Sequence, residues 1–202
     1  MVEIIDVRVF KVREYAGKKH AAEFSYALNE KEWTIQELEG HLSWFNSYEI
    51  SNDRFRDYMT HYDYHKQTGL LRTLFIDYCE RITGKSYDIN ELKRIMAADP
   101  TIEHILSQTP KFKPSSYDFK DTEDFENHKN LLGNLTLLEK KINSSIKNYD
   151  LVEKVPAYGK SEFKITSTIG TSIATMNNVF KKNDLIQRSE DLARDFSTRW
   201  ST

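Results

Sequence analysis

The chain of 202 residues has little cysteine, glycine or proline, with one, seven and four residues respectively. A single thiol, Cys79, excludes an internal disulfide and a cysteine-rich zinc site, and its apolar helical surroundings predict a buried, inert side chain. The scarcity of glycine and proline excludes a low-complexity chain. No apolar run is long enough to span a bilayer and no signal peptide is recognisable, so we expect a cytoplasmic protein without membrane contact.

The remaining composition is that of a soluble globular protein, with 39 % hydrophobic and 30 % charged residues. The net charge of −2 gives no indication of a nucleic-acid partner. Residues 129–202, however, contain 12 Lys and Arg against 8 Asp and Glu, whereas residues 1–128 contain 17 against 23. A positive C-terminal part is typical of a surface that faces a polyanion, and chance variation explains it equally well.

Hydrophobic periodicity predicts a strand and a helical bundle in residues 1–98. Thr34 and Glu37 form a capping-box pattern, and Gly84 is expected to end a long apolar helix. The expected elements are a strand over 3–15 and helices over 18–31, 34–48, 51–62 (capped by Ser51 or Asn52), 66–85 and 88–99.

The pattern changes after Pro100. Two strand-like runs are separated by a polar stretch that we interpret as a long loop, and helices follow. The expected elements are strands over 101–106 and 133–140, the loop over 107–128, a helix from Asn143 that stops before Pro156, and helices over 161–182 and 183–200, the last capped by Asn183.

Strand, loop, strand and helix is the element order of the ββα-metal motif, which needs a histidine that takes a proton from water and a hard divalent cation on the scissile phosphate. His104 ends the first strand and is the candidate base. Glu103 and Asn143 carry the oxygen atoms that such a cation prefers. The Asn134 amide both donates and accepts, so we expect it to hold the loop that carries His104. Adjacent strand residues face opposite ways, so a bend is required for Glu103 and His104 to act together.

The segments TIEHILSQTP, HKNLLGNLTLLEKKINSSIKNYDLVEK and DLIQRSEDLARDFSTRW resemble the C-terminal domain of GmrSD-type restriction proteins, an HNH-like nuclease family. The resemblance covers residues 60–202. Matching positions are Glu103, His104, Gln108, Gly133, Asn134, Asn143, Asn148, Lys154, Ile186, Arg188 and Trp200. Ser107 stands where the family usually has proline, which we expect to loosen the loop after His104, and Phe180 stands where tryptophan is common.

The resemblance implies an α+β, mainly α fold: a helical bundle with an embedded ββα-metal (HNH-like) motif, in domains 1–98 and 99–202 or as one continuous domain. It implies a metal-dependent DNA endonuclease, the effector half of a restriction protein that cuts foreign or modified phage DNA. The expected cofactor is Mg²⁺, with Mn²⁺ or Ni²⁺ as alternatives. The expected partners are DNA, a ParB-like nucleotide-binding domain absent from this chain, and a second copy, because double-strand cutting by a single-site nuclease favours a dimer.

The residue roles that follow are specific. His104 and Asn134 form the catalytic group, Glu103 and Asn143 bind the metal, Lys147 and Lys154 contact DNA phosphates, and Asn148, Gln108 and His128 support the site.

Other interpretations of these residues stay open. Asn143 is also a candidate helix N-cap, Asn134 a turn residue, Asn148 a structural hydrogen-bonding group, and Lys154 a solvated helix lysine. His61 and His65 have the spacing of a transition-metal pair on a helix, although a surface role is the simpler interpretation. The rival function is a degenerate nuclease fold that binds DNA or docks another domain without catalysis. A third reading is an RNase or toxin.

Overall fold

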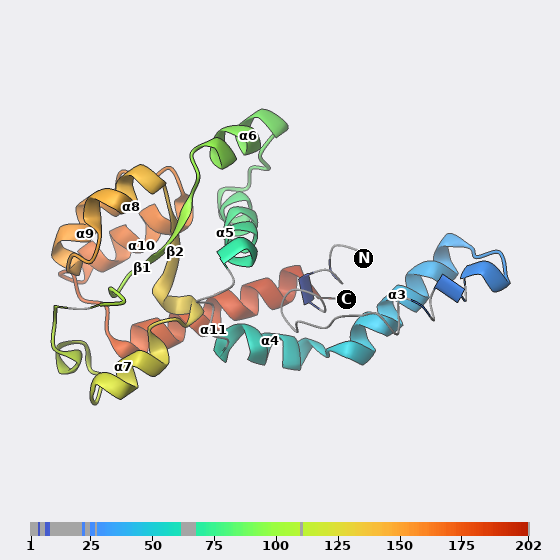
Figure 1. Ribbon diagram of the computed structural model, residues 1–202, viewed down its shortest axis with the longest axis horizontal. Helices are drawn as coiled ribbons and strands as arrows, with labels where there is room; N and C mark the ends of the chain where they lie inside the picture. The colour runs from blue at the N-terminus through green and yellow to red at the C-terminus, as the bar shows by residue number, and fades with distance from the viewer. Residues whose placement is uncertain are drawn as a thin grey trace. The chain divides into compact units, whose positions relative to one another are not determined.

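The computed structural model describes residues 4, 7–8, 22, 25–26, 28–61, 68–109 and 111–201. Helices dominate these residues and one two-stranded sheet accompanies them, which agrees with the expected α+β, mainly α class (Figure 1). No helix within the described ranges is both long and apolar enough to cross a membrane.

The helices expected before residue 100 are present: α3 (Ile35–Glu49), α4 (Asn52–His61), α5 (Thr68–Thr83) and α6 (Ile89–Ala97). Thr34 and Glu37 form the predicted capping box of α3. Gly84 follows α5 with a φ of 64°, a conformation that glycine adopts without steric cost. Cys79 is buried within α5, as expected.

Two expected elements fall mainly outside the described residues. Of the strand over 3–15, only Ile4, Val7 and Arg8 are described, and their backbone is helical rather than extended. The described part of the helix expected over 18–31 is helical.

Residues 101–201 form two short strands and five helices, with two 3-10 turns between them. The elements are β1 (Thr101–His104), η3 (Pro114–Tyr117), α7 (Thr122–His128), η4 (Leu132–Asn134), β2 (Leu135–Leu138), α8 (Lys140–Ile146), α9 (Leu151–Tyr158), α10 (Lys164–Thr175) and α11 (Lys182–Arg199).

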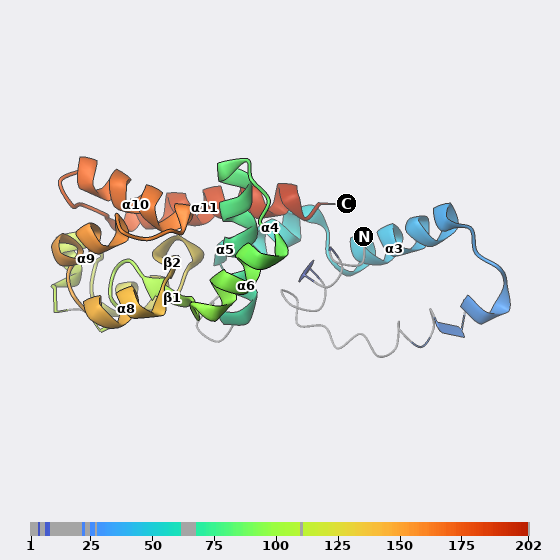
Figure 2. The same cartoon turned by 90° about the horizontal axis from the view of Figure 1, so that it is seen from above.

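The sheet pairs β1 with β2 in antiparallel register, with Glu103 opposite Thr136 and His104 opposite Leu135. Both strands contact α5, and β1 also contacts α8 (Figures 1 and 2). The predicted order of strand, strand and helix is therefore present in β1, β2 and α8. Four-residue strands make a small sheet, so the surrounding helices must supply most of the stability.

The expected loop over 107–128 contains a helix, α7, that the sequence reading missed. Asp121 caps α7 by accepting a hydrogen bond from the backbone of Asp124 at 2.9 Å. Phe125 packs edge-on against Phe119, with ring centroids 5.1 Å apart. A helix of one to two turns has little stability of its own, so burial of Phe125 is what fixes it.

The helix expected from Asn143 to residue 154 is also wrong. Asn143 is the fourth residue of α8, and the chain turns at Lys147 with φ 43° and ψ −129° before α9 begins. Pro156 lies inside α9 rather than beyond it. A proline in this position lacks the N–H that would bond the carbonyl of residue 152, and its ring crowds that carbonyl. Asn183 likewise lies within α11 rather than capping it.

Contacts divide the chain into two compact units, residues 61–192 and residues 1–60 with 193–202. The larger unit contains the sheet, and the boundary expected at residue 98 falls inside it. One of its core clusters is made of Ile105, Leu106, Phe119, Phe125, Leu151, Val155, Ile173, Phe180 and Leu185. In the smaller unit, the buried Arg8 guanidinium donates to the carbonyls of Ile50 and Trp200.

Candidate active site

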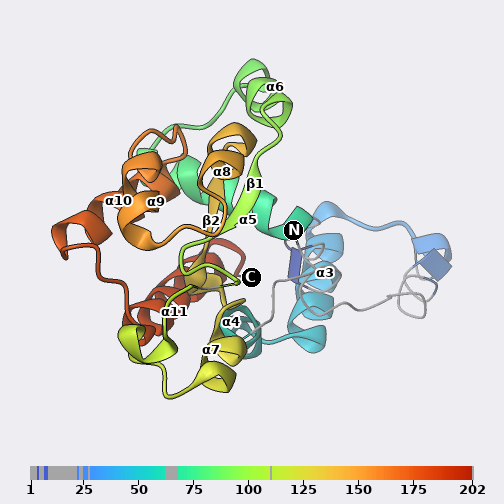
Figure 3. The same ribbon diagram turned by 60° about the vertical axis from the view of Figure 1, so that its left-hand side comes forward.

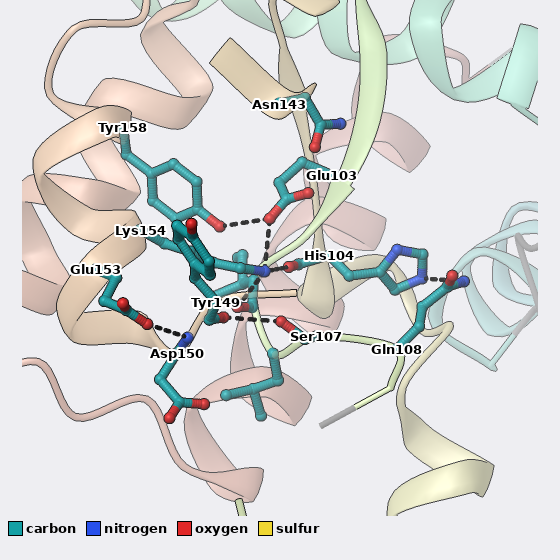
Figure 4. Close-up of polar contacts among 12 residues, drawn as sticks. Glu103, His104, Ser107, Gln108, Asn143, Tyr149, Asp150, Glu153, Lys154 and Tyr158 are labelled. Atoms are coloured by element: carbon teal, nitrogen blue, oxygen red, sulfur yellow. Dashed lines mark hydrogen bonds and ion pairs between the residues drawn. The ribbon is translucent and has the colours of Figure 1, made fainter. Parts of the chain in front are cut away.

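Glu103 is buried on the face of β1 that α9 covers, and Figure 4 shows its carboxylate turned toward that helix. Its Oε1 atom lies 2.6 Å from Lys154 Nζ and accepts a hydrogen bond from the Tyr158 hydroxyl at 3.0 Å. Burial raises the pKa of Glu103, and the Lys154 ammonium acts in the opposite direction. The carboxylate is therefore held by Lys154 and Tyr158 through Oε1, and it also interacts with the backbone of His104.

Lys154 projects from α9 into the interior, where its side chain is 1 % exposed. Besides Glu103, Nζ donates to the carbonyl oxygen of His104 at 2.6 Å, so the lysine spans the end of β1. Burial lowers the pKa of Lys154, opposed by the charge of Glu103. This placement disagrees with the predicted phosphate contact and with a solvated helix lysine, because the ammonium is enclosed and already paired.

The His104 imidazole points the other way from β1 and is partly exposed (Figure 4). Its Nε2 atom lies 3.1 Å from Asn130 Oδ1 and 3.1 Å from Gln108 Nε2. The ring nitrogen cannot donate to one amide and accept from the other at once, so the proton position and the amide orientations are linked. In either neutral tautomer one ring nitrogen retains a lone pair that can accept a proton.

Asn134 holds the segment that follows His104, as the sequence predicted. Its side chain is fully buried at the end of η4, accepts from Leu106 N at 2.8 Å, and donates to the carbonyls of Leu106 at 3.0 Å and Lys129 at 2.7 Å. Its backbone carbonyl accepts from Ile105 N at 2.8 Å. The Asn134 side chain thus bonds to Leu106, near the start of the segment between the strands, and to Lys129, near its end.

Ser107, the departure from the family pattern, is buried, and its hydroxyl donates to the carbonyl oxygen of Tyr149 at 2.9 Å. This hydrogen bond joins the segment after His104 to the connection between α8 and α9. The expected loosening of the segment stays a prediction.

Asn143 lies on the same face of the sheet as Glu103. Its Nδ2 donates to Thr101 Oγ1 at 2.8 Å, and Thr101 shares a face of β1 with Glu103 because the two are two residues apart. Asn143 Oδ1 accepts no hydrogen bond from the residues that the structure describes, and Figure 4 shows this oxygen on the side of the amide that faces Glu103. Asn143 is not a helix cap, since α8 begins three residues earlier.

These two side chains fit a hard cation, with one carboxylate and one amide oxygen on a common face. No group of three or more His, Cys, Asp or Glu side chains suited to a metal occurs among the described residues. An ion held by Glu103 and Asn143 would therefore complete its shell with water or phosphate oxygen, as Mg²⁺ often does.

Through its contact with Thr101, Asn143 lies on the same face of the sheet as Glu103, but His104 does not share that face. Strand alternation persists to the end of β1, so His104 lies on the opposite face from Glu103 and Asn143 (Figure 4). The expected convergence of the imidazole and the Asn143 amide is therefore not observed. Glu103 and His104, adjacent residues at the end of β1, point their side chains to opposite faces.

The supporting residues are distributed around this site. Gln108 contacts His104, in agreement with its expected supporting position. His128 ends α7 and contacts the Asp124 carbonyl at 2.6 Å. Lys147 and Asn148 are exposed, and the Asn148 side chain makes no hydrogen bond with the residues that the structure describes. His61 is exposed, whereas His65 lies outside the described residues, so their metal pairing stays a prediction.

Sequence reasoning missed the partners that hold Glu103 and His104. Tyr158 and Asn130 are remote from those residues in sequence, and each contributes one polar atom to a partner on another element. Lys154 was identified, but its partner was not. The one available signal is positional, since Lys154 and Tyr158 are four residues apart and must share a face of α9.

The chain was compared with known proteins. No curated protein and no solved structure matches it. Residues 49–195, which include every residue of the site described above, match the family of the C-terminal domain of GmrSD restriction endonucleases. The chain belongs to this family, the C-terminal domain of GmrSD restriction endonucleases.

Proposed function

We propose that this chain is a metal-dependent endonuclease domain of the HNH type that hydrolyses phosphodiester bonds in DNA, with His104 as the general base. The observation that carries the proposal is the partly exposed His104 imidazole, fixed by Asn130 and Gln108 at the end of a strand that Asn134 clamps. Family membership supports a nuclease role and DNA as the substrate.

In the proposed reaction, His104 accepts a proton from the attacking water. The water oxygen forms a bond to phosphorus as the bond from phosphorus to the 3′ oxygen breaks. The deprotonated water ends on the new 5′ phosphate, and the 3′ oxygen takes a proton from solvent.

Glu103 Oε2 and Asn143 Oδ1 are the proposed ligands of a divalent cation, Mg²⁺ in the first instance, with Mn²⁺ or Ni²⁺ as alternatives. Such an ion, when bound, would neutralise charge on the phosphate and the departing oxygen. For the ion and His104 to act on one phosphate, the end of β1 must bend, because Glu103 and His104 face opposite ways in this structure. Lys154 fixes the rotamer of Glu103 through Oε1, and Thr101 fixes that of Asn143 through Nδ2. Both ligands are therefore oriented before an ion arrives.

Exposed Lys147 is the proposed phosphate contact beside the site. The wider context is also a proposal: the domain serves as the effector half of a cytoplasmic phage-defence protein that cuts foreign or modified DNA, works with a ParB-like nucleotide-binding domain, and dimerises for double-strand cutting. Whether β1, β2 and α8 form a ββα-metal motif depends on whether this site binds a metal ion.

The test is cleavage of supercoiled plasmid by the full chain with Mg²⁺ or Mn²⁺, with and without EDTA. We expect nicking that EDTA abolishes, and loss of cutting in His104→Ala without loss of the circular-dichroism spectrum. His61→Ala is the matched control, because it makes the same change at an exposed histidine outside the proposed site. A His104→Ala protein that cuts like the parent would end the assignment. Parallel assays on RNA separate a DNase from an RNase.

One observation favours a second candidate function. The Glu103 carboxylate is already paired with a buried ammonium, which opposes the arrival of a divalent cation. A degenerate fold that binds DNA or docks another domain without cutting it is consistent with that pair. Magnesium binding by isothermal titration distinguishes the two, with Glu103→Gln and Asn143→Ala as the variants that must weaken it in the nuclease.

A further inference from the structure

The turn before β2 is held by the part of α11 that belongs to the larger unit. Arg188 of α11 places Nη1 at 2.7 Å from the Gly133 carbonyl oxygen and at 2.8 Å from that of Leu135. The Leu132 carbonyl oxygen is 3.4 Å from the same atom. One guanidinium nitrogen thus reaches the acceptors on both sides of Asn134, and its two N–H groups allow it to donate to both at once.

Ser189, the next residue of α11, binds a backbone N–H group of the same turn. Its hydroxyl accepts from Gly133 N at 2.7 Å and donates to Leu185 O at 3.0 Å. Gly133 has no Cβ, and one built there would overlap the Leu185 carbonyl and the Ser189 hydroxyl. The turn therefore lies directly on the backbone of α11, and both its donor and its acceptor groups are satisfied by residues 188 and 189.

The Arg188 side chain makes these contacts as a charged group. Burial lowers the pKa of Arg188 to about 10, which leaves the guanidinium protonated at neutral pH. Its Nη2 atom is buried without a hydrogen-bond partner among the described residues. Enclosing a cation in this way is costly, so the three carbonyl contacts must compensate for lost hydration. Arginine at 188 is thus a specific choice rather than a solvated surface residue.

We propose that Arg188 is a positioning residue for His104, acting through the turn of residues 132–135 and through Asn134. The path is continuous: Arg188 fixes the carbonyls that flank Asn134, Asn134 fixes both backbone groups of Leu106, and Leu106 lies two residues after His104. This inference rests on the proposed role of His104 as the base. A displacement of about 1 Å at a reacting group can cost roughly 100-fold in rate, so fixing the backbone two residues after His104 is expected to affect the rate of cleavage.

The experiment uses the full chain with Arg188→Met, Arg188→Lys and Ser189→Ala, and with Gln187→Ala as the control on the solvent side of the same helix. Three readouts are taken: amide hydrogen exchange at Ile105 and Leu106, the NMR signals of the His104 ring, and kcat and KM for plasmid nicking.

We expect Arg188→Met to accelerate exchange at Ile105 and Leu106 by roughly tenfold or more relative to α10 amides, because the loss of a charged hydrogen-bond donor is worth at least that factor. The His104 ring signals shift, and kcat falls by roughly 10- to 100-fold with KM unchanged. Arg188→Lys recovers part of kcat, and Gln187→Ala changes none of the three.

Two results would overturn the proposal. One is unchanged exchange at residues 105–106 and unchanged His104 signals in a folded Arg188→Met protein. The other is acceleration that is uniform across residues 68–192 with kcat per folded molecule unaltered, which would make Arg188 a general stabilising residue. If Arg188→Met does not fold, the milder Ser189→Ala decides by the same criteria. Failure of the parent to cut DNA removes the proposed function, while exchange and ring signals still decide the positioning.

Discussion

Replacing Asn134 with alanine removes the side chain that joins the two ends of the segment between β1 and β2. The three hydrogen bonds lost have donor–acceptor distances of 2.8, 3.0 and 2.7 Å and lie in the protein interior. At about 1 kcal/mol each they contribute about 3 kcal/mol, and leaving the two Leu106 backbone groups buried without partners brings the loss toward about 5 kcal/mol.

The assay must report on the larger unit. All three tryptophans, Trp33, Trp44 and Trp200, belong to the smaller unit, so tryptophan fluorescence is unsuited to the measurement. Native-state hydrogen exchange of the β2 amides gives the free energy of unfolding directly. We expect Asn134→Ala to lower that free energy by about 3–5 kcal/mol.

The matched control is Asn148→Ala, the same chemical change at an exposed amide without side-chain hydrogen bonds to described residues. It is expected to alter the free energy by less than about 0.5 kcal/mol. A loss below about 1 kcal/mol for Asn134→Ala, close to that of the control, would refute the reasoning, because the clamp would then be redundant with the backbone pairing.

Three further changes have expected outcomes. Lys154→Met leaves the buried Glu103 carboxylate without its partner and should lower the free energy of unfolding by about 3–5 kcal/mol at pH 7. Burial raises the pKa of Glu103, so the carboxylate of the folded protein becomes protonated as the pH falls toward 5, and the loss of stability should shrink. Urea denaturation at a series of pH values measures this loss. Gly133→Ala should destabilise the larger unit by about 3 kcal/mol or more in the same exchange experiment, because the added methyl group meets the Leu185 carbonyl. Lys147→Gly should raise the free energy of unfolding by about 1 kcal/mol, because φ 43° with ψ −129° strains a residue that has a side chain. If Lys147 contacts a DNA phosphate, the same change should weaken DNA binding and reduce the dependence of the binding constant on salt concentration.

Each of these changes has an internal control. Glu103→Gln in the Lys154→Met background removes the unpaired charge, and failure to recover stability there contradicts the electrostatic explanation. Gly69→Ala adds a methyl group where no atom lies within 4 Å and should be neutral or stabilising. Lys141→Gly places glycine inside α8 and should cost about 1 kcal/mol, opposite in sign to Lys147→Gly.

Local signals were sufficient for the helices before residue 100. The capping box at Thr34 and the glycine stop at Gly84 are formed by neighbours in sequence, so periodicity and capping chemistry located α3 and α5 correctly. The same local reasoning missed α7, whose stability comes from Phe125 packing on distant rings, and joined α8 to α9 across Lys147, which adopts a backbone conformation rare outside glycine.

For the site, the sequence predicted the contacts of a residue that carries both donor and acceptor groups. It did not predict the ion pair between two residues that are distant in sequence. The Asn134 clamp followed from the chemistry of a carboxamide beside a strand. The Glu103–Lys154 pair did not, because whether a lysine is solvated or enclosed depends on packing of α9 against β1. Alternation along β1 was the correct guide to His104 and Glu103, and no bend overcomes it.

The dependence of the turn before β2 on Arg188 has a consequence for biosynthesis. α11, the last helix of the chain, contacts the turn that precedes β2 (Figure 3). A chain emerging from the ribosome folds from its N-terminus, so the segment that follows His104 is exposed before α11 has been translated. Under the proposed role of Arg188, that segment is held in place only after residues 188 and 189 have left the exit tunnel. Nascent chains, and products of premature termination before Arg188, are therefore expected to lack an ordered segment after His104.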